Sequence, residues 1–160
     1  MATTNDINNV IGPVMYGFCF FAATNNAIVN GALTTVLYQA TPLWDKDANF
    51  NYATGTYTVA SPGLYTYDLQ LVGNAVASCV YRAVIVVERS SSAVYRSYNE
   101  IISGTAPTFY TPIVRLTSVV PLNSGDKVYS QILMGSGTGT KTLNASISNF
   151  WTLYKFGDIA

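Results

Sequence analysis

The chain has 160 residues, the usual length of one domain. Its eight basic and eight acidic residues make up 10% of the sequence, against about 25% in typical soluble domains, and they balance to a formal net charge of zero. There is no histidine. The balanced charge excludes a basic nucleic-acid-binding surface, and the lack of histidine excludes most histidine-dependent catalysis and zinc binding.

The low charge predicts neither disorder nor a membrane span. Apolar residues make up 49% of the chain, and 12 Tyr, 7 Phe and 2 Trp are typical of a folded domain. The longest apolar stretch, residues 10–23, is interrupted by Gly12, Pro13 and Gly17 and is shorter than the ~20 residues that cross a bilayer, so we expect no membrane insertion. The remaining explanation is a surface that is neutral and polar or covered by another subunit. We therefore expect an oligomer.

Residues 1–12 are polar and without pattern, which predicts an N-terminal arm ahead of one domain over residues 13–160. No Lys or Arg precedes the apolar stretch, and the only charge there is Asp6. This start is unlike a secretion signal and favours synthesis in the cytosol. In a reducing cytosol Cys19 and Cys79 are expected to be free, buried thiols, with a disulfide as the alternative.

From residue 57 onward the pattern is one of strands and turns. Residues 57–60 and 64–72 predict two strands joined at a Pro62-Gly63 turn, in which Gly63 takes a positive φ. Residues 64–71 alternate with a period of two, and the β-branched run at 80–87 is typical of a strand buried on both faces. Further strands are expected at residues 93–102, 109–120, 127–133 and 146–156. With no helical stripe, the sequence predicts an all-β sandwich or barrel with jelly-roll connections.

Prolines and one acidic side chain add detail to these strands. Pro112 is expected at a bulge or a sheet edge and Pro121 at the end of its strand, because proline cannot donate to a ladder. The Asn123-Ser-Gly-Asp segment, with Gly125 and Asp126, predicts a tight turn. Asp68 is expected to pair across strands with one of four arginines. These are Arg82, Arg89, Arg96 and Arg115.

Three segments, at residues 50–67, 121–131 and 148–156, together resemble the globular head family of C1q, within the C1q/TNF superfamily. They are similar to its Thr-Gly…Pro-Gly-hydrophobic-Tyr, Leu-x-x-Gly-Asp-x-Val and closing aromatic-strand motifs. The chain departs from the pattern at Thr152, where the family has glycine, and at Lys155, where the family has an apolar residue. No collagen-like Gly-X-Y stalk precedes the head.

The resemblance implies a ten-stranded jelly-roll sandwich that assembles as a tight homotrimer. Trimer-interface candidates follow from it, although in an isolated monomer they would be ordinary core residues. They are Phe18, Phe20, Tyr65, Tyr67, Phe150, Trp151 and Tyr154.

Two loops have the composition of ligand sites. Asp45, Asp47 and Asn49 offer oxygen ligands at alternate positions, as a calcium loop does, and some members of the resembled family bind Ca²⁺. The glycine and glutamate of an EF-hand are missing, so a solvated loop is the alternative. The glycine-rich residues 135–141 lack the following helix of a phosphate loop. Apart from calcium we expect no cofactor.

The sequence favours a non-enzymatic module, because without histidine no nucleophile has an evident base. The first hypothesis is a structural or recognition subunit of a virus or phage particle, such as a capsid, decoration or fibre-head protein. The alternative is a soluble or secreted C1q-like head that binds a protein or a glycan. In that case Asn144 would be a glycosylation site. Candidate contact residues would be Trp44, Tyr95, Tyr98 and Tyr110.

Overall fold

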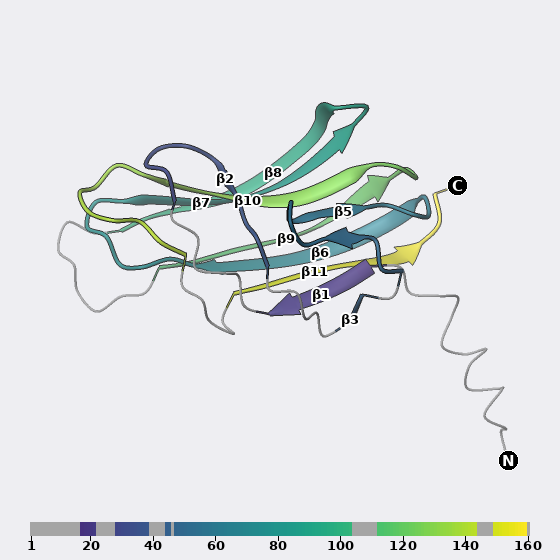
Figure 1. The fold of residues 1–160 in the computed structure, drawn as a ribbon, viewed down its shortest axis with the longest axis horizontal. Helices are drawn as coiled ribbons and strands as arrows, with labels where there is room; N and C mark the ends of the chain where they lie inside the picture. Colours follow the sequence, from purple (N-terminus) through teal and green to yellow (C-terminus); the bar gives the residue numbers. More distant parts are fainter. Residues whose placement is uncertain are drawn as a thin grey trace, which may run out of the picture.

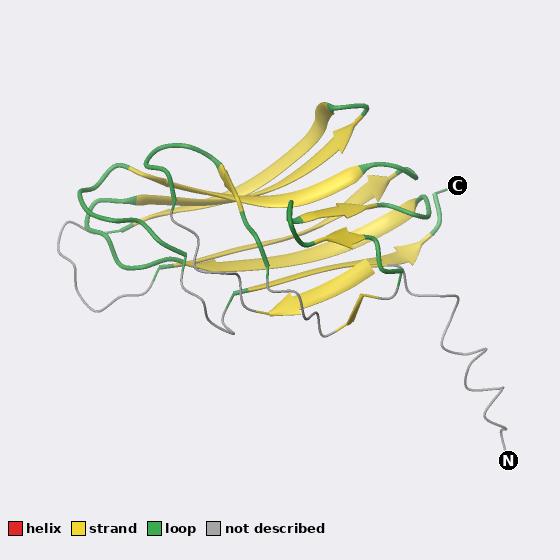
Figure 2. Ribbon diagram, in the orientation of Figure 1, coloured by secondary structure: helices red, strands yellow, loops and turns green. Residues whose placement is uncertain are grey.

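A computed structural model describes residues 17–21, 28–38, 44–45, 47–103, 112–143 and 149–159. They form eleven strands and no helix, arranged as two sheets that face each other (Figures 1 and 2). The strands are β1 (Gly17–Phe21), β2 (Thr34–Thr35), β3 (Trp44–Asp45), β4 (Phe50–Asn51), β5 (Thr56–Thr58), β6 (Gly63–Val72), β7 (Val80–Arg89), β8 (Ser92–Ile102), β9 (Ile113–Leu122), β10 (Lys127–Gly135) and β11 (Phe150–Gly157). Within these ranges no helix is long and apolar enough to span a membrane. The expected arm at residues 1–12 lies outside them.

The connections are those of a jelly roll. One sheet has the order β3-β1-β11-β6-β9, and the other has the order β4-β5-β10-β7-β8, with β2 paired to β10. From β5 onward the chain crosses between the sheets at every connection except the one from β7 to β8. The predicted all-β jelly-roll sandwich is confirmed. The strand number exceeds ten because two-residue pairings such as β2 and β3 are counted.

The predicted alternation along β6 decides which side chains fill the space between the sheets. Tyr65, Tyr67, Leu69 and Leu71 are at most 1% exposed and belong to the core. Trp151 of β11 joins them at 0% exposure. Such aromatic side chains bury large apolar areas, which is the main favourable contribution to folding.

Gly63 begins β6 and does not have the positive φ that was expected, so that reason for a glycine is wrong. A Cβ at this position would lie 2.5 Å from the carbonyl oxygen of Gly157 and 2.3 Å from Cε of Lys155. The glycine is required because β11 approaches closely here, beside the bulge between Lys155 and Gly157. The exposed Pro62 belongs to a connection between the two sheets, since β5 and β6 lie in different sheets.

The Asn123–Asp126 segment is a turn closed by a hydrogen bond from Asp126 N to Asn123 O of 3.1 Å. Gly125 has φ 84°, the value that favours glycine at the third position of a type II turn. Asp126 is 2% exposed and accepts two hydrogen bonds of 2.7 Å from Arg89 and one of 2.8 Å from Asn123 N. Burial alone would raise the pKa of this carboxyl, but these donors and the charge of Arg89 hold it below its ordinary value.

The prolines and Cys79 lie where the sequence suggested. Pro112 directly precedes β9, which is an edge strand, and Pro121 is the second-last residue of β9. Cys79 is a free, buried thiol, and burial raises its pKa. The side chain of Cys19 is outside the described residues.

Candidate functional site

Strand parity, meaning whether a side chain points between the sheets or outward, divides the predicted trimer-interface residues into two groups. Tyr65, Tyr67 and Trp151 point between the sheets and are at most 1% exposed, so they have no surface left for a partner. This burial favours the alternative in which these three are ordinary core residues. Phe150 and Tyr154 point outward from β11, and Tyr154 is 38% exposed. Phe18 and Phe20 lie on β1, but their side chains are outside the described residues.

We call the outward-pointing side chains of β6, β9 and β11 the five-strand face. It exposes four large apolar side chains from two strands. They are Ile113 (47% exposed), Val119 (51%), Tyr154 (38%) and Phe156 (53%). The two β9 residues were not among the predicted interface residues. Val119 and Tyr154 flank Thr66 in the strand register, whereas Ile113 lies six residues further along β9, so apolar side chains are exposed at both ends of this face. Exposed apolar surface of this kind makes the face a candidate interaction surface.

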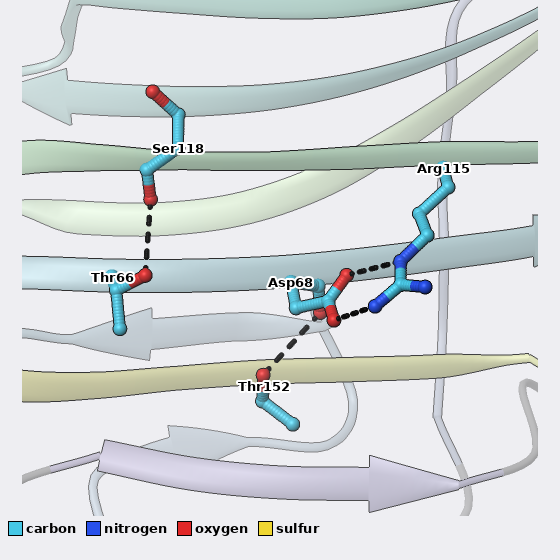
Figure 3. Close-up of polar contacts among 5 residues, drawn as sticks. All are labelled: Thr66, Asp68, Arg115, Ser118 and Thr152. Atoms are coloured by element: carbon cyan, nitrogen blue, oxygen red, sulfur yellow. Dashed lines mark hydrogen bonds and ion pairs between the residues drawn. The ribbon is translucent and has the colours of Figure 1, made fainter.

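One ion pair lies in the middle of this face (Figure 3). Arg115 of β9 donates to both carboxylate oxygens of Asp68 on β6, at 3.0 and 2.6 Å. The pair is diagonal, because Arg115 lies directly opposite Gln70 in the strand register. Hydrogen bonding to Asp68 and its charge raise the pKa of Arg115. Among the four arginines considered from the sequence, Arg115 is therefore the partner of Asp68.

The pair also connects to β11. The guanidinium of Arg115 lies 5.7 Å from the ring centroid of Phe150, within the range of a cation–π contact. The Thr152 hydroxyl donates to the backbone oxygen of Asp68 at 3.5 Å, and that of Thr66 donates to the Ser118 backbone oxygen at 3.3 Å (Figure 3). These contacts link the three strands that carry the face.

The outward-pointing side chains of β7, β8 and β10 form the six-strand face. Here Arg82 donates to Glu100 at 2.7 Å, and its guanidinium lies 4.9 Å from the ring centroid of Tyr98. Val84 and Val86 point outward from the middle of β7, yet they are 4% and 0% exposed. Long side chains lie opposite them in the strand register on both neighbouring strands. These are Tyr98 and Gln131 beside Val84, and Arg96 and Tyr129 beside Val86.

The two faces also differ in charge and in where their apolar side chains are exposed. The six-strand face carries five charged residues, against the single pair of the five-strand face. They are Arg82, Glu88, Arg96, Glu100 and Lys127. Its exposed large apolar residues lie along the edge strand β8. They are Val94 (51%), Tyr98 (63%) and Ile102 (71%).

The predicted calcium loop brings two carboxylates together. The Tyr57 hydroxyl and the Asn49 amide donate to one oxygen of Asp47, at 2.5 and 3.1 Å. Burial, followed by the charge of Asp47, raises the pKa of Asp45. Oδ1 of Asp45 and Oδ1 of Asp47 are buried without a hydrogen-bond partner. No group of three His, Cys, Asp or Glu gathers in the described part of the chain, and Asn49 turns its amide nitrogen to Asp47. Calcium binding stays a prediction.

The aromatic residues considered for ligand contact do not form one site. Tyr98 is exposed on β8, whereas Tyr95 turns inward and its hydroxyl lies 3.2 Å from that of Tyr67. The side chain of Trp44 and all of Tyr110 are outside the described residues.

Comparison with known proteins gives the fold. The sequence matches no protein-family model and no curated protein. The structure is similar to Eiger TNF from S. frugiperda, with a TM-score of 0.67, 16% identity and coverage of 92% of this chain and 96% of that one. It is also similar to murine APRIL (TM-score 0.62, 16% identity, 89% and 99% covered) and to the globular domain of the zebrafish complement 1qA protein (0.55, 14%, 91% and 96%).

The chain has the C1q/TNF-like jelly-roll fold. Each of these structures covers about nine tenths of the chain, so the similarity includes both sheets. At 14–16% identity the shared feature is the fold, and the properties of the faces must be argued from this chain's own residues.

Proposed function

We propose that the chain is a non-enzymatic recognition module that assembles as a homotrimer through the five-strand face. The exposed apolar side chains of that face, around a single ion pair, carry the proposal. Covering them removes apolar surface from water, which contributes roughly 25 cal/mol per Å² to association. A three-fold arrangement is the one implied by the resemblance to C1q heads.

The carboxylates support a binding module rather than an enzyme. Asp68, Glu100 and Asp126 are each held by an arginine at 2.6–2.7 Å. A general acid or base must be within reach of a substrate and tuned to give or take its proton. Carboxylates held by arginines in this way serve the structure instead.

Sedimentation velocity at micromolar concentration and neutral pH tests the assembly directly. The expected mass is three times the 17.3 kDa of one chain. A protein that remains at 17.3 kDa across this concentration range would contradict the proposal, because four large apolar side chains would then face water permanently.

For the biological setting, we propose a structural or recognition subunit of a virus or phage particle that binds a protein or glycan partner. The low charge and the neutral polar composition support a subunit packed among other subunits. Detection of the protein on purified particles is the expected result. Recovery only from culture medium, with a glycan at Asn144, would instead identify the secreted binding head.

A further inference from the structure

We propose that the Asp68–Arg115 pair is the specificity determinant of the five-strand face: it makes self-assembly depend on both charges and restricts the partner to a surface without excess charge, a further copy of this chain. This inference rests on the proposed function, since it concerns the face through which the copies meet. It assigns the pair a role in the choice of partner rather than in folding.

The pair is isolated among neutral side chains. The other outward positions of β6, β9 and β11 carry threonine, glutamine, proline and apolar residues. No other charged group on these three strands points outward, so the described residues of this face offer neither member a substitute partner. Lys155 belongs to the opposite parity and binds Asp158 and Ser61.

The geometry satisfies the Asp68 carboxylate within one chain. Both carboxylate oxygens of Asp68 accept from Arg115, and the guanidinium also lies over Phe150. Bidentate arginine–carboxylate pairs combine directional hydrogen bonds with charge neutralisation. A neutral surface can therefore cover the intact pair without leaving a hydrogen-bonding group of the carboxylate unmet.

In a single chain the Asp68–Arg115 pair contributes little to folding stability. The side chain of Arg115 is 59% exposed and that of Asp68 27%, and ion pairs at such positions contribute little to folding because water and salt screen them. Covering the face changes this, because the charges then lie in a medium of low dielectric. Removal of one partner would leave the other charge buried and unpaired, which is strongly unfavourable.

The same argument selects the partner. A surface that brings a charge against this neutral pair leaves that charge without compensation, and like charges opposed across an interface are unfavourable. A copy of this chain brings a face on which the only outward charges of β6, β9 and β11 already cancel. A second copy is therefore the occupant that the charge pattern fits.

The test compares three variants of this pair with matched variants on the other sheet. Asp68→Asn, Arg115→Gln and the double variant are measured by sedimentation velocity over a range of concentrations, beside wild type. The control pair, Arg82 and Glu100, has the same residue chemistry, a similar aromatic contact and side-chain exposures of 38% and 29%. Arg82→Gln, Glu100→Gln and their double variant are its matched set. Urea unfolding of each protein verifies that it is folded.

We expect each single change at the pair to weaken association on the order of 100-fold, and the double variant to recover most of that loss. The control set should leave association within about threefold of wild type, as expected for exposed ion pairs. Should a single variant fail to fold, Arg115→Lys keeps the charge without the bidentate geometry, and it should weaken association less than Arg115→Gln.

The outcomes separate the two proposals. Trimeric wild type with single variants that associate equally well would overturn the role of the pair and leave the assembly face standing. An equal loss in the double variant would also overturn it, because an unpaired charge would not be the cause. A wild-type protein that is monomeric throughout would instead contradict the proposed function itself.

Discussion

The five-strand face and the six-strand face each carry an arginine that pairs with a carboxylate and lies over an aromatic ring. On the six-strand face that motif lies at the edge strand β8, beside Tyr98 (63% exposed) and Ile102 (71%), on strands that carry three further outward charges. On the five-strand face the motif stands among exposed apolar residues on strands with no other outward charge. The local motif is the same, and its surroundings decide what it can do.

The comparison shows that the alternation of side chains along a strand separates exposed from buried aromatic residues, which aromatic content alone does not. Trp151 and Phe150 are neighbours in the sequence, yet one fills the core and the other lies beside Arg115 on the surface. Exposed side chains gain from a partner, whereas fully buried ones have already contributed to folding.

The largest expected effect distinguishes the inward-pointing from the outward-pointing side chains of β11. Trp151→Ala should lower the free energy of unfolding by about 3–5 kcal/mol, because it empties a fully buried aromatic position. Tyr154→Ala should change folding little and weaken association instead, because Tyr154 lies on the five-strand face. Urea unfolding and sedimentation velocity on both variants measure the two effects. Equal loss of folding stability in the two variants would show that parity does not divide β11 in this way.

The second prediction compares matched substitutions on the five-strand face and the six-strand face. Val119→Glu places an unpaired carboxylate on the five-strand face and should dissociate the trimer, with association weakened about 100-fold or more. Val94→Glu, at the same 51% exposure on β8, is the matched control and should leave the mass unchanged. Light scattering gives both masses. If only Val94→Glu dissociates the protein, assembly uses the six-strand face, and the assignment of the two faces is reversed.

A smaller effect concerns the shape of the sheet that supports the five-strand face. Gly63→Ala should cost about 1–3 kcal/mol of folding stability, because the new Cβ would lie 2.5 Å from the carbonyl oxygen of Gly157 and push β11 outward. Gly125→Asn is its control: φ is 84° there, but a Cβ at Gly125 would have no atom within 4 Å, and asparagine tolerates positive φ. Thermal unfolding ranks the two. A larger loss at Gly125 would mean that backbone conformation, not space, governs both positions.

The fold could be predicted from the sequence because each strand has a local pattern of apolar residues. The alternation along residues 64–71 and the uninterrupted run at 80–87 depend only on which neighbours are apolar, and both appear as expected in β6 and β7. The partner of Asp68 required more, since four arginines satisfy the same rule until the register of β6 against β9 is known.

The exposed apolar residues of the five-strand face were harder to predict, because strand alternation alone does not identify them. In β9 both parities are apolar in part: Val114 and Leu116 enter the core while Ile113 and Val119 remain outside. A period of two cannot then say which set faces a partner. Gly63 illustrates a second limit, because its need for glycine comes from the approach of Gly157, nearly a hundred residues away in the sequence.

The smallest expected effect is on a part of the chain that belongs to neither face. The pKa of Asp126 is held below its ordinary value in the folded chain, so its contribution to stability is present above about pH 4, the unfolded value, and is lost as pH falls through the folded value. Asp126→Asn should therefore be less stable than wild type at neutral pH, and the difference should narrow as the pH is lowered to 2.

Asp45 gives the opposite sign and so serves as the control. Its pKa is raised by burial and by the charge of Asp47, so the ionised form opposes folding at neutral pH, and Asp45→Asn should lose less stability there than Asp126→Asn. Unfolding measured from pH 2 to 7 on monomeric Val119→Glu as background removes assembly from the result. A pH dependence that survives only in the trimer would place the acid-sensitive groups at the interface instead of at the β9–β10 turn.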